Sequence, residues 1–236
     1  MMMQSLRHRV RALRARLSSV RYRHRGLQKI FEDIYTNRNW GGGQEDAGAF
    51  NSGSGSDSGP SQPYVDIIRK YIRESGANSV VDLGCGDFRV GSRIVAGLGV
   101  RYTGVDIARP LIAHLNATAA GPMVEFQCLN LVDDPLPQGD LYLIRQVLQH
   151  LSNQQISTIL RKLKGATVIV TEHIPTNRSA KWNKDKVAGP DIRLFRNSGV
   201  FLEHPPFSLN LETLLEVPQP FNGVDAILRT SLIRST

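Results

Sequence analysis

The sequence has few cysteines and no long apolar run. Cys85 and Cys128 are the only cysteines among 236 residues, too few for a disulfide framework or a metal cluster built from thiolates. No stretch of 18 apolar residues occurs, which argues against a helix that spans a membrane. The six histidines lack the spacing of metal ligands. We therefore expect a protein of a reducing, cytoplasmic compartment that binds no metal.

Acidic residues are absent from the first 30 positions, which contain eight arginines and one lysine. The whole chain carries a net charge of +8 and this segment alone +9, so the rest of the chain carries the difference, −1. The basic charge thus belongs to an N-terminal arm. Because a nucleic-acid channel needs clustered cations on the domain that forms it, we do not expect nucleic acid as a partner.

Apolar side chains recur in steps of three and four from Leu6 to Ile34, with arginines between them. This spacing predicts a basic amphipathic helix over residues 1–34. Four roles stay open for it. It can lie on an anionic membrane surface as a peripheral anchor or pair with another helix through residues 5–34. It can also be a mitochondrial transit peptide, or simply pack on its own domain.

Glycine and serine dominate residues 35–61. Such a composition indicates a flexible linker, and a loop of this length beside a domain is often a lid. The prediction is therefore a loop or lid over residues 35–61, followed by the main domain over residues 62–236.

The main domain opens on a strand that runs into a glycine turn. Val80, Val81 and Leu83 precede Gly84-Cys85-Gly86, and we expect a helix from about residue 90 to 98. Strand, glycine turn and helix form a nucleotide-binding crevice at the carboxyl end of a parallel sheet. Position 89 is Arg, where the dinucleotide fingerprint has a third glycine. Asp82 instead favours a ligand with an ammonium group over a pyrophosphate, which its carboxylate would repel.

A second strand over residues 101–106 ends in Asp106. An acid at this place is suited to accept hydrogen bonds from ribose hydroxyls; the alternative is that it only caps the following helix. Further strands are predicted over 123–129, 141–144 and 166–171, and helices over 63–75, 108–116 and 153–163, the last with Asn153 as its cap. An antiparallel pair over 213–217 and 225–233 closes the sheet. The alternation predicts a doubly wound α/β fold.

Three stretches, Val80–Gly86, Thr103–Asp106 and Asp140–Leu151, together resemble the motifs of the class I S-adenosylmethionine-dependent methyltransferases. The resemblance implies a seven-stranded, mainly parallel, Rossmann-like sheet with S-adenosylmethionine as cofactor. It places the methionine end near the first glycine turn, the ribose at the second strand and the adenine after the third. The cofactor-binding residues that it implies are Asp82, Gly84, Cys85, Gly86, Asp106, Ile107, Asn130 and Leu131. Asn130 stands where the family usually has an acid.

The fourth strand leads into Arg145-Gln146-Val147-Leu148. Amino-group methyltransferases of the resembling fold have an Asn/Asp-Pro-Pro-aromatic cluster here, so its absence argues for a hydroxyl or carboxylate acceptor. His150 or His173 is our candidate for the base, although either histidine can be purely structural. Arg145 is expected to shape the acceptor side.

Tyr35–Gly41, Ser58–Pro60 and the polar stretch 174–206 resemble a bacterial methyltransferase subfamily of unassigned substrate, several of whose members look like glycan-modifying enzymes. Asp185 and Arg193 in that stretch are the predicted acceptor-binding residues. The resemblance implies an enzyme that methylates an oxygen of a sugar, a glycan or another small molecule. Two alternatives remain, a non-catalytic methyltransferase-like adaptor and an RNA methyltransferase that uses the Arg-rich arm.

Overall fold

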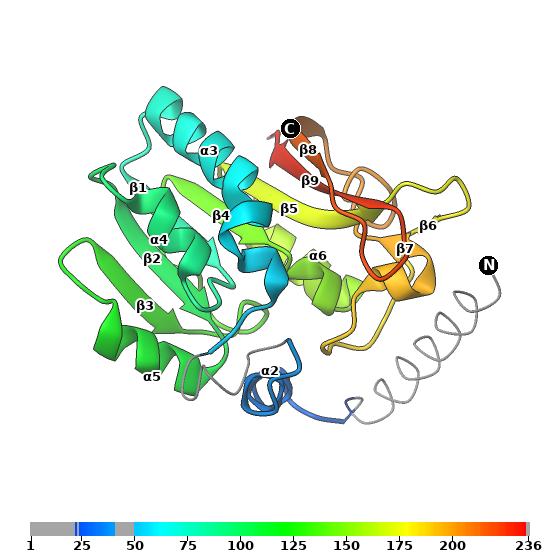
Figure 1. Cartoon of the computed structure of the whole chain (residues 1–236), viewed down its shortest axis with the longest axis horizontal. Coiled ribbons are helices and arrows are strands. Elements are labelled where there is room, and N and C mark those ends of the chain that lie inside the picture. The colour runs from blue at the N-terminus through cyan, green and yellow to red at the C-terminus, as the bar shows by residue number, and fades with distance from the viewer. Residues whose placement is uncertain (1–21, 23, 41–49, 235–236) are drawn as a thin grey trace.

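The computed structural model describes residues 22, 24–40 and 50–234, which build a seven-stranded sheet flanked by helices (Figure 1). The strand order is β3-β2-β1-β4-β5-β9-β8. The parallel strands are β1 (Ser79–Leu83), β2 (Arg101–Asp106), β3 (Val124–Cys128), β4 (Leu141–Arg145) and β5 (Val168–Pro175). β8 (Leu211–Pro218) and β9 (Ala226–Ile233) complete the sheet in antiparallel orientation. This confirms the predicted doubly wound, Rossmann-like fold.

The strand order reverses between β1 and β4. From β1 the chain builds outward to β2 and β3, then returns to the other side of β1. Leu83 pairs with Val105, and Asp82 pairs with Leu143, so the carboxyl ends of the three central strands lie at one edge. Ligands of open α/β sheets bind at such a switch point.

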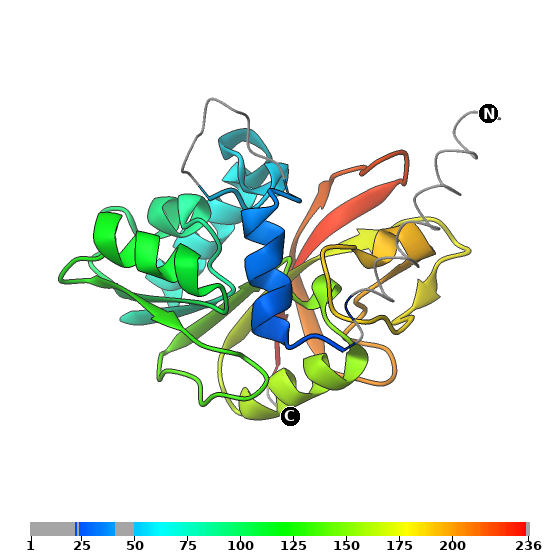
Figure 2. The ribbon, with the colours of Figure 1, turned by 90° about the horizontal axis from the view of Figure 1, so that it is seen from below.

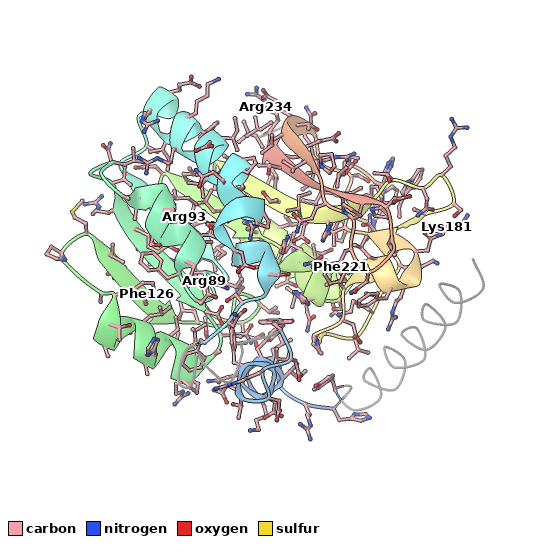
Figure 3. The ribbon with its side chains drawn as sticks, in the orientation of Figure 1. Arg89, Arg93, Phe126, Lys181, Phe221 and Arg234 are labelled. Carbon is pink, nitrogen blue, oxygen red and sulfur yellow. The ribbon has the colours of Figure 1, made fainter. Side chains whose placement is uncertain are left out.

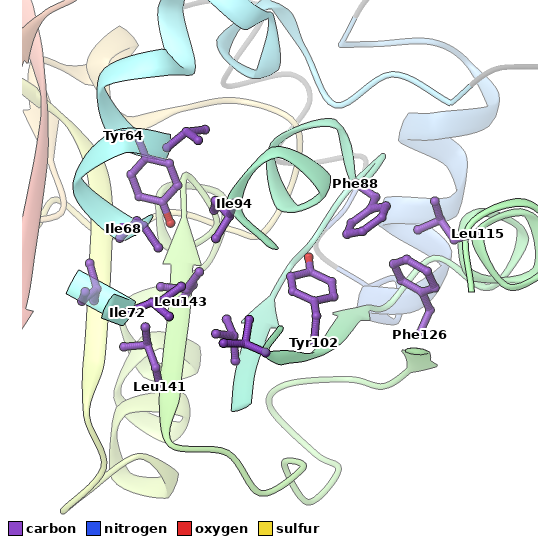
Figure 4. Packing of buried hydrophobic residues seen from close by; sticks show 14 of the residues in the cluster. Tyr64, Ile68, Ile72, Phe88, Ile94, Tyr102, Leu115, Phe126, Leu141 and Leu143 are labelled. Carbon is purple, nitrogen blue, oxygen red and sulfur yellow. The ribbon is translucent and has the colours of Figure 1, made fainter. Parts of the chain in front are cut away.

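Helices α3 (Ser58–Ser75), α4 (Arg89–Val95) and α5 (Arg109–Thr118) cover one face of the sheet, and α6 (Asn153–Lys162) packs on the other. Ile68 and Ile72 of α3 point toward Leu141 and Leu143 of β4 (Figure 4). The central strands are almost entirely buried, as expected for parallel strands that have both faces covered.

Helix α2 (Leu27–Thr36) runs across the carboxyl edge of the sheet (Figure 2). Its buried Ile30 and Ile34 pack together with Tyr22. Residues 27–34 of the predicted amphipathic helix are therefore helical, but the helix is not continuous, because residues 24–26 are not helical and the extended Gly26 is the N-cap of α2. The rest of that prediction, residues 1–21 and 23, lies outside the described residues.

Two helix starts differ from the sequence-based expectation. Helix α3 begins at Ser58 rather than Pro63, because Pro60 lies in the first turn, where an N–H has no partner within the helix. Helix α6 is capped by Ser152, not by Asn153. The Ser152 hydroxyl accepts from the backbone of Gln155, and the Gln155 side chain accepts from the backbone of Ser152, which is a capping box.

After β5 the chain forms an insertion over residues 176–210. It holds a small parallel sheet of β6 (Lys181–Trp182) and β7 (Ser198–Gly199) and the short helix η4 (Arg193–Arg196). Two further short helices are η2 (Ser54–Ser56) and η3 (Leu148–His150). Within the part of the chain that the structure describes, no helix is both long and apolar enough to cross a bilayer.

Candidate active site

A cavity of about 550 Å³ opens at the carboxyl edge of the sheet. Helix α2 and residues 52–56 form part of its wall, together with the ends of β1, β2, β4 and β5. All eight predicted cofactor residues line it: Asp82, Gly84, Cys85, Gly86, Asp106, Ile107, Asn130 and Leu131. Arg145, His150 and His173 line it as well. The fold thus gathers most of the predicted site into one space.

The turn after β1 requires glycine at two positions. Gly84 and Gly86 have φ angles of +87° and +56°, a region that side chains with a Cβ rarely adopt. A Cβ at Gly84 would lie 2.4 Å from Val147 Cγ2, and one at Gly86 would lie 2.3 Å from Ser52 Oγ. The turn therefore brings bare backbone to the cavity wall.

Asp106 ends β2 beneath this turn. Its Oδ2 accepts a hydrogen bond from the backbone N–H of Gly86 (3.3 Å), and its Oδ1 accepts one from Ala108 (3.0 Å). The second contact holds the backbone N–H of Ala108, which is the N-cap of α5. Asp106 thus supports the start of the helix without being its cap. Burial raises the pKa of Asp106 to about 6, and the backbone N–H groups partly offset this rise.

Asp82 and Arg145 bring opposite charges to neighbouring strand ends. Burial raises the pKa of Asp82 to about 6, while a hydrogen bond from Tyr102 and the charge of Arg145 lower it. Arg145 donates to the carbonyl of Gly55 at 2.6 Å and lies 5.2 Å from the ring centre of Tyr64. Burial lowers the pKa of Arg145. An acid and a base at this place match the ammonium and carboxylate groups of an amino-acid moiety.

Asn130 follows β3 and forms a tight turn. Its Oδ1 accepts from the backbone of Val132 (3.0 Å), and its Nδ2 donates to Asp133 (2.6 Å). The backbone N–H of Asn130 donates to Asp134. The amide oxygen keeps a second lone pair, so its predicted contact with adenine remains compatible with this turn. Among the described residues, no group of three His, Cys, Asp or Glu side chains is arranged to hold a metal ion.

The two candidate bases differ in their surroundings. The Nδ1 atom of His150 lies 3.2 Å from the Gly189 carbonyl, and burial, with the nearby charge of Lys186, lowers its pKa to about 3. The Nε2 atom of His173 lies 2.8 Å from the carbonyl of Gln219, and burial lowers its pKa as well. A carbonyl only accepts, so each of these nitrogens carries the proton and the other ring nitrogen has a free lone pair.

Residues 50–57 are docked over the glycine turn. Ser52 and Asp87 exchange two hydrogen bonds of 2.8 Å, one from each backbone N–H to the other side chain. Arg89 bridges Asp87 and Asp57. The Gly/Ser composition predicted a linker or a lid, and these contacts hold this part of the segment against the turn.

Asp185 and Arg193 do not line the cavity. Asp185 is exposed and accepts from the backbone of Asn153. Arg193 is buried and donates to the carbonyls of Lys184 and Leu151. Both side chains thus fasten the insertion to the start of α6 and the residues just before it, and neither lines the cavity with the other predicted site residues.

Several lining residues were not predicted. Tyr35 and Trp40 pack edge to face over the cavity, and Trp40 also contacts His150. Phe221 lies at the tip of the β8–β9 hairpin. Its signal in the sequence was Asn222-Gly223, since this pair favours a two-residue hairpin turn and both residues have positive φ.

Four buried polar atoms among the described lining residues have no hydrogen-bond partner: Trp40 Nε1, Arg145 Nε, Gln146 Nε2 and Gln149 Oε1. Buried polar groups are normally paired, so atoms of this kind in a cavity wall indicate a polar ligand. Together with the bare glycine turn and the charges of Asp82 and Arg145, they fit the amino-acid and nucleoside parts of S-adenosylmethionine.

Comparison with known proteins bears on this geometry. Residues 80–167 match the family model of a methyltransferase domain. Over these residues the chain is similar to a methyltransferase domain. The matched residues run from β1 to the residue before β5 and include every predicted cofactor residue, so this part of the cavity wall comes from the matched region.

Solved structures show the same fold at low identity. An N1-methyltransferase of 1,6-didemethyltoxoflavin from Burkholderia thailandensis is 17% identical, with a TM-score of 0.55 over 89% of this chain and 88% of that chain. Magnesium protoporphyrin IX methyltransferase from Synechocystis PCC 6803 is 16% identical, with a TM-score of 0.53 over 88% and 100%. The N-methyltransferase NodS from Bradyrhizobium japonicum WM9 is 12% identical, with a TM-score of 0.53 over 75% and 88%. A comparison with curated proteins found no match.

Proposed function

We propose that this methyltransferase transfers the methyl group of S-adenosylmethionine to a hydroxyl oxygen of a small molecule, sugars included. The observation that carries the proposal is His173. It lines the cavity and donates from Nε2 to a backbone carbonyl, which leaves Nδ1 as an acceptor for a hydroxyl proton. The absence of an Asn/Asp-Pro-Pro-aromatic cluster after β4 supports oxygen over nitrogen as the accepting atom.

The proposed cofactor contacts lie at two places along the carboxyl edge of the sheet: the ends of β1 and β4, and the ends of β2 and β3. Asp82 and Arg145 face the ammonium and carboxylate of the methionine part, and the turn from Gly84 to Gly86 lies along it. Asp106 accepts from the ribose hydroxyls, and Asn130 with Leu131 binds the adenine. S-adenosylmethionine supplies a methyl group already activated by positive sulfur. The chain therefore needs to contribute alignment and one base.

We assign the base to His173 rather than His150. Both rings are neutral at pH 7, but the pKa of His150 is lowered to about 3, and a group this weakly basic is a poor proton acceptor. The ring of His150 lies 5.2 Å from that of Trp40, so we give it a role in holding the cavity wall.

Calorimetric titration of S-adenosylmethionine into ligand-free protein tests the cofactor site, with Asp106→Ala as the comparison. Micromolar binding that weakens strongly in the variant supports the proposal. Mass spectrometry of hydroxyl compounds incubated with the cofactor then tests transfer. Binding without turnover for any acceptor would favour the adaptor alternative, and no binding to folded wild type would reject the methyltransferase function.

We also propose that the basic segment over residues 1–21 attaches the enzyme to an anionic membrane surface as a peripheral, cytoplasmic protein. Its support is the sequence alone: six arginines and no acid stand in this segment, and each basic residue near anionic lipid contributes about 1 kcal/mol.

A further inference from the structure

The cavity extends beyond the matched domain. Its far side is formed by His173 at the end of β5, residues 190–192 and Phe195 of the insertion, and residues 219–222 of the β8–β9 hairpin. All of these residues follow position 167, where the family match ends. The cofactor half is thus built by the shared domain, and this second half by segments outside that match.

Two phenylalanine rings lie together with His173 in the second half. The ring of Phe221 lies 5.8 Å from the ring of His173 and 5.9 Å from that of Phe195. Ile192 adds an aliphatic side chain beside them. Figure 3 shows Phe221 at the hairpin turn near the sheet edge, whereas Lys181 projects outward from β6. Rings in such contact stack well on another flat ring.

The charges of the cavity disfavour an anionic ligand at this end. Arg145 is the only Lys or Arg among the described residues that line it, and Asp82 lies close enough to influence its pKa. Asp191 contributes a carboxylate to the second half itself. The proposed function pairs Arg145, which lies close enough to His173 to lower its pKa, with the carboxylate of the cofactor. No other lining Lys or Arg among the described residues is then left to pair with a carboxylate or phosphate on the acceptor.

We propose that this half of the cavity, defined by His173, Phe195 and Phe221, binds an uncharged, planar ring that carries a phenolic hydroxyl. The ring lies against Phe221, and its hydroxyl points to Nδ1 of His173. This inference rests on the proposed function and narrows its acceptor from hydroxyls in general to phenols.

The acidity of the hydroxyl supports a phenol over a sugar. The pKa of His173 is lowered by burial, so it is a weak base and matches a phenol, with a pKa of about 10 as in tyrosine, better than an aliphatic alcohol. In the transfer, the phenolic oxygen forms a bond to the methyl carbon as the methyl–sulfur bond breaks. The phenolic proton passes to His173, and the products are the methyl ether and S-adenosylhomocysteine.

Three probes separate the chemistries: p-cresol, p-toluate and methyl β-glucoside. The first two share a flat ring and differ in charge, and the third has hydroxyls without an aromatic ring. Binding is measured by calorimetry with and without S-adenosylhomocysteine, and methylation by mass spectrometry. We expect p-cresol to bind and to be methylated. Phe221→Ala should weaken its binding about 3- to 10-fold, as expected for a lost aromatic pair of about 0.5–1.5 kcal/mol, and Phe221→Trp should restore it.

Trp182→Ala is the matched control, because Trp182 is a 57% exposed aromatic residue of the insertion and does not line the cavity. It should leave p-cresol binding unchanged. Preferred binding of p-toluate or methyl β-glucoside, no p-cresol binding, or an unchanged affinity in Phe221→Ala would overturn the proposal. The p-cresol titration and the cofactor titration test different claims. Failure of the cofactor to bind rejects the proposed function, while p-cresol binding alone decides the ring subsite.

Discussion

The hydroxyl of Tyr102 on β2 donates a 2.8 Å hydrogen bond to Oδ2 of Asp82 on the neighbouring strand β1. Both side chains are buried, and this bond opposes the effect of burial on the pKa of Asp82. Tyr102 does not line the cavity. It is therefore a positioning residue that helps to keep Asp82 ionised near neutral pH, the state that a cationic ligand needs.

Replacing Tyr102 by Phe should raise the pKa of Asp82 above about 6. Loss of a hydrogen bond to a charged acceptor costs about 1.5–3 kcal/mol, which raises the pKa by about one to two units, so we expect about 2- to 15-fold weaker binding of S-adenosylmethionine at pH 7. Binding should recover as the pH rises, since Asp82 then ionises. Calorimetry across pH 6–9 measures this profile. Tyr142→Phe is the control, because the Tyr142 hydroxyl donates to the carbonyl of Pro137 and the residue does not line the cavity. If Tyr102→Phe gave the same pH profile of binding as wild type, the role of Tyr102 would be contradicted.

The ligand-free protein should lose stability as the pH rises from about 4 to about 6. The pKa of Asp106 is about 6 in the folded state and about 3.9 in the unfolded chain. Within this window the folded state binds more protons, so the free energy of unfolding falls with pH, by about 3 kcal/mol at most for this group. Asp106→Asn cannot ionise and should lack this component. Urea unfolding at several pH values measures the free energy of unfolding of both proteins. The value for Asp106→Asn minus that for wild type should increase from about pH 4 to about pH 6. A difference that does not change with pH would argue against the raised pKa of Asp106.

Gly84→Ala should abolish most cofactor binding. The new Cβ would lie 2.4 Å from Val147 Cγ2 and also requires a left-handed backbone at φ +87°, so the turn must shift. Gly97→Ala is a matched control, since its φ is +68° and nothing lies within 4 Å of the added Cβ. Both variants should lose about 1–2 kcal/mol of stability through backbone strain. Only Gly84→Ala should lose binding by calorimetry, and equal affinities would show that the turn does not contact the cofactor.

The sheet and the cofactor half followed from local sequence patterns. Val80, Val81 and Leu83 are apolar because the strand is covered on both faces, and Gly84 and Gly86 mark a turn that only a backbone without Cβ atoms can form. Asp106 was predictable because its distance from the glycine turn is fixed by one helix and one strand. Each of these signals lies within about 30 residues, as expected for a βαβ unit.

The second half of the cavity could not be read in the same way. His173 was a candidate from the sequence, but Phe195 and Phe221 reach it from two other segments. Their approach depends on the packing of the insertion, for which no periodicity exists. Asp185 and Arg193 were chosen because their stretch resembles a substrate-side insertion and long loops often carry function. Arg193 instead donates to the backbone carbonyls of Lys184 in the insertion and Leu151 before α6. The hydrogen bonds between Ser52 and Asp87 were not predictable, because a Gly/Ser composition does not reveal a docked conformation.

Removal of residues 1–21 should separate the membrane and RNA roles of the arm. The cut must stop there, because Tyr22 is buried against Ile30 and Ile34, and Leu27 and Phe31 line the cavity. Cofactor affinity should then stay within about twofold of the full chain. We expect the full chain to sediment with phosphatidylserine vesicles and the truncated chain to remain in solution, since six arginines are lost. A full chain that ignores these vesicles but binds single-stranded RNA in a salt-dependent manner, with that binding lost on truncation, would instead support a nucleic-acid clamp.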